Sequence, residues 1–302
     1  KFSCLYPLSF YTASRVSNMS IAYLNGEWNQ MSDTKVSVLD RGFMFGDGVY
    51  EVVPVYKKKA FTLKEHLARL GRSLDEIKIT NPLDDAGWTS LIEEAIERSD
   101  EYDAVVYIQV TRGASESREH VWPENTPATV LVMVYDAPLL SRNEVPPYKM
   151  ITLEDFRWQK GHIKSVSLIA AGLFKNEAVA RGADDTILIK NGFVTEASAS
   201  NVYIVKDSVL ITPPTSNSIL HGITRHLVLS LARGDGMSVE EREISVSELD
   251  DADEVLISSA GHEVWPVGSV NSKPVGNAEG GVVWQRLDQL FQRYKAEVQS
   301  IV

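Results

Sequence analysis

The sequence predicts an α/β (α+β) protein of two domains. Short apolar runs typical of buried strands are mixed with amphipathic helical stretches, without strict alternation. A segment with three prolines, residues 137–148, separates two strand-like runs, and 302 residues suffice for two domains of ordinary size. We therefore expect an N-terminal domain over residues 19–138, an interdomain linker over 139–146 and a C-terminal domain over 147–302.

The first 18 residues differ from the rest of the chain. They contain Lys1 and Arg15 but no acidic residue, and they show no hydrophobic period, whereas Met19 opens a hairpin-like stretch. We interpret Met19 as the natural start, so that residues 1–18 are a leader that is disordered or not native. An organellar transit peptide, which is also free of acidic residues, is the alternative.

The elements expected in the N-terminal domain begin with a tight hairpin, because apolar residues flank Asn25-Gly26. A helix follows over residues 62–79, since its leucines recur at helical spacing and Thr62 with Glu65 matches a capping box. A second helix is expected over 86–98. Apolar runs predict strands at 49–56, 60–63, 104–113 and 128–136, with a polar loop over 113–127 that is long enough to suggest a function.

The C-terminal domain is expected to mix strands and helices in the same way. Its helices are predicted over 161–182, with Lys164 near the start, over 222–234 and over 282–298. Its strands are predicted at 149–154, 186–189, 201–205, 208–212 and 254–261.

Composition limits the classes of function. The 41 acidic residues outnumber the 30 basic ones, and no basic run stands out, so nucleic acid is not an expected partner. No apolar stretch approaches the roughly 18 residues of a membrane span, and no metal site is expected. Cys4 is the single cysteine, so no disulfide forms within the chain. This fits a reducing compartment, and a cytoplasmic location is expected.

Lys164 is the first candidate for chemistry. It is the only charged residue between His162 and Lys175, and small and apolar residues follow it. A lysine at a helix start is usually a surface residue. A lysine held in an apolar site instead has a lowered pKa and can act as an amine nucleophile that forms an imine.

Three further signals are weak separately. Glu196 lies among small residues after a strand-like run, where it is either a solvated turn residue or a carboxylate held against a ring nitrogen. Gly222 leads into Ile223 and Thr224 at a helix start, where free N–H groups favour a phosphate. Arg69 lies on the helix face opposite most leucines, as a surface ion pair or a bidentate phosphate clamp. Together with Lys164 they match the needs of one cofactor, pyridoxal 5'-phosphate (PLP).

The stretches "DRGFMFGDGVYEVV", "EHLARL", "IKS", "VTEASASN" and "ILHGITR", in this order and spacing, resemble the fold-type IV PLP enzymes. The resemblance runs from Met19 to the C-terminus and implies a two-domain fold with PLP in the C-terminal domain. It makes Lys164 the Schiff-base lysine and proton carrier, with Glu196 facing the pyridine nitrogen. The phosphate would be held by Arg69, Ile223 and Thr224, with help from Ser259 and its neighbour Ala260.

The stretch over residues 107–128 is similar to that of bacterial D-amino acid aminotransferases. In those enzymes an Arg-x-His pair from the partner subunit joins a tyrosine to hold the substrate carboxylate. Here the resemblance implies Arg118 and His120 of a partner subunit, with Tyr50, in a homodimer. An arginine fork fixes a planar carboxylate in one orientation, which decides the substituent on Cα that faces the lysine.

Two departures from the family pattern concern substrate preference and one phosphate contact. Related enzymes often carry a hydroxyl residue where this chain has Ala260, and the residues after Lys164 are smaller than usual. The expected activity is transamination of D-amino acids, of the D-alanine type, with 2-oxo acids such as 2-oxoglutarate. The alternatives are a branched-chain L-amino acid or (R)-amine transaminase, or aminodeoxychorismate lyase, of the same fold. A PLP carrier without turnover is a rival that the retention of Lys164 and Glu196 argues against.

Overall fold

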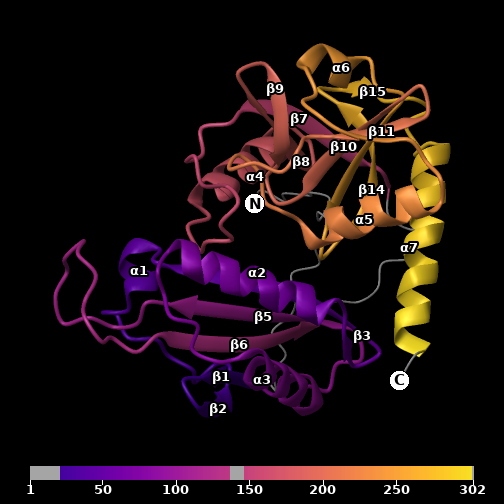
Figure 1. Cartoon of the computed structure of the whole chain (residues 1–302). Coiled ribbons are helices and arrows are strands. Elements are labelled where there is room, and N and C mark those ends of the chain that lie inside the picture. Colours follow the sequence, from indigo (N-terminus) through magenta and orange to yellow (C-terminus); the bar gives the residue numbers. More distant parts are fainter. Residues whose placement is uncertain (1–20, 137–145, 301–302) are drawn as a thin grey trace, which may run out of the picture.

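The computed structural model describes residues 21–136 and 146–300. The predicted leader and nearly all of the predicted linker therefore lie outside the described residues. The described chain forms two sheets, one before and one after residues 137–145 (Figure 1). The domain boundaries expected from the sequence stay predictions.

The first sheet has six strands in the order β2-β1-β6-β5-β3-β4, and every pair is antiparallel. Alternate valines and isoleucines of β3, β5 and β6 point to one face, where they share a core with helices α2 and α3. The elements are β1 Ile21–Leu24, β2 Glu27–Gln30, α1 Arg41–Phe45, β3 Gly48–Tyr56, β4 Lys59–Ala60, α2 Leu63–Glu76, α3 Asp85–Arg98, β5 Ala104–Thr111 and β6 Thr129–Asp136.

The second sheet has nine strands, with the order β12-β11-β10-β13-β14-β7-β8-β9 and β15 paired to β14. Three pairs are parallel, namely β11 with β12, β14 with β7, and β7 with β8. Its strands are β7 Tyr148–Glu154, β8 Asp185–Lys190, β9 Phe193–Ala197, β10 Asn201–Lys206, β11 Val209–Thr212, β12 Val239–Glu241, β13 Glu254–Ser259, β14 Glu263–Val270 and β15 Lys273–Pro274. The helices are α4 Ile169–Ala180, α5 Ile223–Gly234, α6 Val246–Asp250 and α7 Val282–Ser300.

Helix α7 joins the two parts of the chain. Phe291 of α7 packs against Phe61, which follows β4, and both belong to a core that also contains Tyr56 and residues of α5 and β13. Figure 1 shows α7, in yellow, extending alongside both sheets. This packing fixes the first sheet beside the second.

Two predictions about helices were wrong in detail. The helix predicted over 161–182 begins only at Ile169, because residues 164–166 in the segment before it form backbone contacts with β3. The capping box at Thr62 is absent: Thr62 has a left-handed φ of 52°, and its hydroxyl donates to the carbonyl of Phe61. Strand β14 was not predicted at all.

No helix in the described part of the chain is both long and apolar enough to cross a membrane. Among the same residues, no group of three or more His, Cys, Asp or Glu side chains is arranged to hold a metal ion.

Candidate active site

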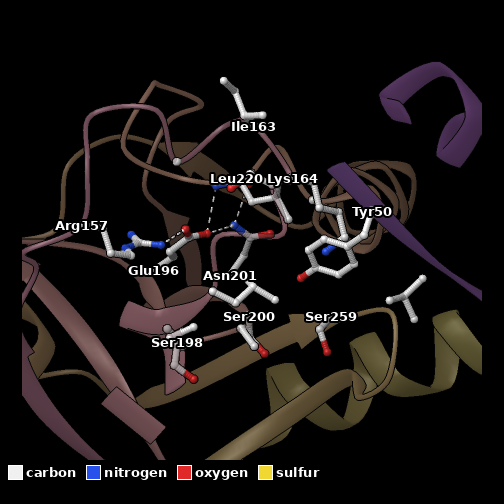
Figure 2. Close-up of a pocket in the computed structure, with 18 of the residues that line it drawn as sticks. Tyr50, Arg157, Ile163, Lys164, Glu196, Ser198, Ser200, Asn201, Leu220 and Ser259 are labelled. Carbon is white, nitrogen blue, oxygen red and sulfur yellow. Dashed lines mark hydrogen bonds and ion pairs between the residues drawn. The ribbon is translucent and has the colours of Figure 1, made fainter. Parts of the chain in front are cut away.

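A cavity of about 510 Å3 lies between the two parts of the chain, a size typical of small-molecule sites. The first part of the chain contributes residues of β3 and α2 to its wall. The second part contributes residues of the 156–168 segment, of β9, of the start of α5 and of the end of β13. Figure 2 shows lining residues from both parts, among them Tyr50 and Glu196. Most of the predicted site residues line the cavity: Tyr50, Arg69, Lys164, Glu196, Ile223, Thr224, Ser259 and Ala260.

Arg118 and His120 do not line this cavity. Both are exposed, and they lie in the long loop between β5 and β6. The guanidinium of Arg118 is 5.2 Å from the centre of the Phe45 ring, and the His120 ring is 5.6 Å from the same ring. Within one chain the predicted carboxylate-binding pair is therefore separate from the other site residues.

Lys164 is positioned by the strand beside it. Its carbonyl accepts the backbone N–H of Tyr50 at 2.9 Å, and the next residue, Ser165, forms a bridge with Val49. Its Nζ lies 4.2 Å from the centre of the Tyr50 ring, where the ring face attracts a cation. The lysine is only partly buried, so the cavity rather than the protein core surrounds its amine.

Glu196 is buried on β9 with both oxygens occupied. Oε1 lies 2.5 Å from Nη1 of Arg157, and Oε2 accepts the backbone N–H of Leu220 at 3.0 Å and the amide of Asn201 at 3.4 Å (Figure 2). Burial raises the pKa of the Glu196 carboxyl, although Arg157 and the Leu220 N–H oppose that rise. A carboxylate kept from water in this way gains strongly from a further positive partner such as a protonated ring nitrogen.

Arg157 is a site residue that the sequence analysis missed. Its Nε and Nη2 donate to Asp155, while Nη1 contacts Glu196, and Asp155 also accepts the hydroxyl proton of Thr195. Arg157 therefore spans two carboxylates and fixes the position of Glu196. The only local signal was an aspartate two residues before an arginine, directly after a strand-like run, which is too common to indicate a site.

We expect Arg157→Met to lower the free energy of unfolding of the cofactor-free protein by about 3–5 kcal/mol, because it leaves buried carboxylates without their cation. Urea denaturation measures the change. Adding Glu196→Gln should restore part of the loss, since one of the unpaired charges is then gone. A double variant as unstable as Arg157→Met alone would contradict the role of the Glu196 pair.

Two nitrogens of the Arg69 guanidinium already pair with a carboxylate, and the role of bidentate phosphate clamp stays a prediction from the sequence. Arg69 is buried, its Nε and Nη2 donate to the two oxygens of Glu51, and Nη1 donates to the His221 carbonyl at 3.3 Å. Burial would raise the pKa of Glu51, but the ion pair with Arg69 and the contact with His66 outweigh it and hold that pKa far below its usual range. The fork of Arg69 is thus occupied, and only its remaining N–H groups are available to a ligand.

The start of α5 provides the anion-binding features expected of a phosphate site. Gly222 is the N-cap and makes no side-chain cap, so the first N–H groups of the helix have no capping side chain. A Cβ on Gly222 would collide with Oδ1 of Asn201, which explains the glycine. Ile223, Thr224 and Ser259 line the same cavity.

Ser200 was also missed from the sequence. It is 5% exposed and lines the cavity, yet its Oγ has no hydrogen-bond partner among the described residues. Buried hydroxyls normally have partners. An unpaired hydroxyl, the uncapped start of α5, a buried glutamate and an accessible lysine in one cavity together fit a phosphorylated pyridine aldehyde such as PLP.

Comparisons with known proteins agree with this arrangement. A family model described as amino-transferase class IV matches residues 48–270. The D-alanine aminotransferase of Listeria monocytogenes serotype 4b is 38% identical over 271 residues, which cover 89% of this chain and 93% of that protein. The D-alanine aminotransferase of Bacillus licheniformis is 36% identical over 268 residues, with 89% and 94% covered.

A solved structure shows the same fold. The branched-chain amino acid aminotransferase from Escherichia coli has a TM-score of 0.82 and 25% identity, and the match covers 91% of this chain and 93% of that one. Because the family model spans most of the chain and relatives more than one-third identical run along nearly its whole length, the chain belongs to the amino-transferase class IV family.

Proposed function

We propose that this chain is a PLP-dependent aminotransferase that transfers the amino group of D-amino acids, D-alanine above all, to 2-oxo acids such as 2-oxoglutarate. The observation that carries the proposal is that Lys164, Glu196 and the start of α5 line the same cavity. The substrate class is supported by the D-alanine aminotransferases of Listeria and Bacillus, which match almost the whole chain.

PLP, when bound, supplies an electron sink that stabilises negative charge on the substrate Cα. The start of α5 and Ser259 would bind its phosphate, and Glu196 would hold a proton on the pyridine nitrogen. Lys164 would carry the cofactor through Nζ. Once substrate has displaced it, Nζ would take the proton from Cα and pass it to the cofactor carbon that had been the aldehyde, and it would move a proton in the opposite direction when the 2-oxo acid is aminated. Tyr50 lies beside Nζ and would keep the amine oriented.

The substrate carboxylate would be bound by Arg118 and His120 of a second copy of the chain. Among the described residues that line the cavity, the arginines are Arg69 and Arg157, and both are paired with carboxylates. A fork for a planar carboxylate therefore has to come from elsewhere.

The surface around the cavity supports a homodimer. Helix α4 is mostly outside the core, since only Phe174 and Ala178 of its residues are buried. Large apolar side chains at the cavity rim are more than half exposed, as expected of an interface. They are Phe156, Trp158, Ile169 and Leu173.

A second candidate function is transamination of branched-chain L-amino acids, favoured by the Escherichia coli structure. (R)-amine transamination and aminodeoxychorismate lysis use the same fold. The Arg-x-His pair at 118–120 favours the D-amino acid activity over all three. We also propose that the enzyme works in the cytoplasm, which fits its single cysteine.

A panel of D- and L-amino acids and (R)-1-phenylethylamine, each with 2-oxoglutarate, tests the proposal, with the glutamate product resolved by chirality. We expect D-alanine to give pyruvate and D-glutamate, with L-leucine and (R)-1-phenylethylamine much slower. Production of L-glutamate from 2-oxoglutarate at the higher rate, with L-leucine as the amino donor, would replace the proposal with the branched-chain activity.

We expect Glu196→Gln to bind PLP but to react with D-alanine at least about tenfold more slowly, because one charge-assisted hydrogen bond is worth about 1.5–3 kcal/mol. Single-turnover spectroscopy measures the rate of the first half-reaction. An unchanged rate would show that Glu196 is not the partner of the ring nitrogen.

A further inference from the structure

Ser259 is hydrogen-bonded to His262, which is not one of the residues that line the cavity. Ser259 ends β13 and lines the cavity. Its Oγ is 3.0 Å from Nδ1 of His262, and Nε2 of His262 is 2.7 Å from the hydroxyl of Tyr148 on β7. The imidazole therefore connects a hydroxyl at the cavity to a tyrosine in the neighbouring strand.

The contacts of Ser259 decide where its own proton points. A hydroxyl has one proton and two lone pairs. The backbone N–H of His262 already donates to Oγ at 3.2 Å. If Nδ1 also donates, both lone pairs are used and the serine proton is free to point into the cavity. If Nδ1 carries no proton, it accepts a hydrogen bond from the serine hydroxyl, and Ser259 turns a lone pair toward the cavity.

A neutral imidazole carries its proton on one nitrogen only, and the partner of the other nitrogen selects the tautomer. The contact between the Tyr148 hydroxyl and Nε2 suits either tautomer, and when the hydroxyl is the donor the ring proton is on Nδ1, facing Ser259. Every donor in this chain then points the same way, from Tyr148 through His262 to Ser259 and into the cavity. Hydrogen bonds aligned in series strengthen one another.

The orientation of Ser259 matters here because the neighbouring side chains at the end of β13 have no hydroxyl or already have a partner, and the guanidinium fork of Arg69 is paired as well. The next residue, Ala260, has no hydroxyl. The hydroxyl of Ser258 is 2.7 Å from that of Tyr203, and the fork of Arg69 is held by Glu51. Ser259 is thus the side-chain hydroxyl that the end of β13 offers to an anion.

We propose that His262 is a positioning residue for the cofactor phosphate, which it serves by donating from Nδ1 to Ser259 so that the serine proton points at the phosphate. The proposal rests on the function proposed above, since it requires PLP in this cavity. Tyr148 assists by favouring the tautomer with the proton on Nδ1.

The test compares two ligands that share a ring and an aldehyde but differ in the phosphate, PLP and pyridoxal. Their dissociation constants from the cofactor-free protein are measured by fluorescence titration for the wild type, Ser259→Ala, His262→Ala and the double variant. We expect each single variant to bind PLP about tenfold more weakly, the effect of one charge-assisted hydrogen bond. Pyridoxal binding should be unchanged, and the double variant should be no weaker than Ser259→Ala.

Two conservative variants distinguish orientation of Ser259 from simple packing. The amide nitrogen of asparagine can take the place of Nδ1 and donate to Ser259, whereas the amide of glutamine reaches the place of Nε2. His262→Asn should therefore keep most of the PLP affinity, and His262→Gln should lose it. Tyr148→Phe removes only a hydroxyl and should weaken PLP binding less than His262→Ala. His226→Ala, on the exposed side of α5, is the matched control and should leave both ligands unaffected.

The proposal is overturned if His262→Ala binds PLP as the wild type does, weakens PLP and pyridoxal equally, or still weakens PLP when Ser259 is already alanine. If the wild-type protein does not bind PLP at all, the proposed function itself fails, and that outcome is separate from the other three.

Discussion

Replacing Lys164 with alanine is expected to lower the rate of D-alanine transamination about a hundred- to ten-thousand-fold, the contribution of a positioned acid–base group. The variant loses the amine that takes the Cα proton, while Glu196 and the start of α5 remain to bind the cofactor. PLP should therefore still bind, without its covalent link to the chain. The measurement is kcat for D-alanine with saturating PLP.

Lys160→Ala is the control for this variant. Lys160 is about half exposed, lies four residues before Lys164 and pairs with Glu76 on the surface. Exposed pairs of this kind contribute little to stability, so the control should keep its activity. Equal losses in the two variants would mean that the loop has been disturbed rather than the chemistry.

Replacing Arg118 with alanine is expected to raise the KM for D-alanine strongly, because carboxylate binding is lost in the ground state and the transition state alike. A charged pair broken on one side costs about 2–5 kcal/mol, which is about thirty- to several-thousand-fold in kcat/KM. Lys164 and Glu196 are untouched, so the visible spectrum of the bound cofactor should persist.

The amine (R)-1-phenylethylamine is the matched substrate control, because it has no carboxylate. Its kcat/KM should change little in Arg118→Ala. If D-alanine and the amine lose the same factor, Arg118 is structural, and the D-amino acid activity loses its main support against the amine transaminase alternative.

Mixing the two impaired variants, assayed with D-alanine, tests whether Arg118 acts across a dimer. In a mixed dimer of Lys164→Ala and Arg118→Ala chains, one site combines the intact Lys164 of one chain with the intact Arg118 of the other. Random exchange should therefore restore about a quarter of the wild-type activity in a two-fold symmetric dimer. No recovery, although exchange is shown by mass spectrometry, would place Arg118 outside the partner's site.

The sequence was informative where chemistry coincides with an unusual local pattern. Lys164 is conspicuous in an apolar stretch, and Glu196 lies in a run of small residues. Arg157 and His262 could not be predicted, because Arg157 contacts Glu196 on β9 and His262 contacts Tyr148 on β7. Ser200 could not be predicted either, because only the fold buries its hydroxyl at the cavity without a partner among the described residues. Arg69 was placed at the cavity, but its bond to Glu51 appears only when β3 and α2 pack together.

The errors in the fold have a similar origin. Residues 165–168 are as small and apolar as those of the helix that follows, so helical periodicity could not locate its start at Ile169. Backbone pairing of Ser165 with Val49 of β3 decides where the helix starts. A pairing between distant segments leaves no periodic pattern in the sequence. Strand β14 was missed since Pro266 and Gly268 interrupt its apolar pattern.

The covalent attachment of the cofactor tests the central claim most directly. The wild-type protein is loaded with PLP, reduced with borohydride so that the bond between the cofactor and a lysine becomes permanent, and digested for mass spectrometry. We predict that the modified peptide contains Lys164 and that no other lysine carries the cofactor in more than trace amounts. Attachment to a different lysine, or to none, would contradict the assignment of this cavity as the active site.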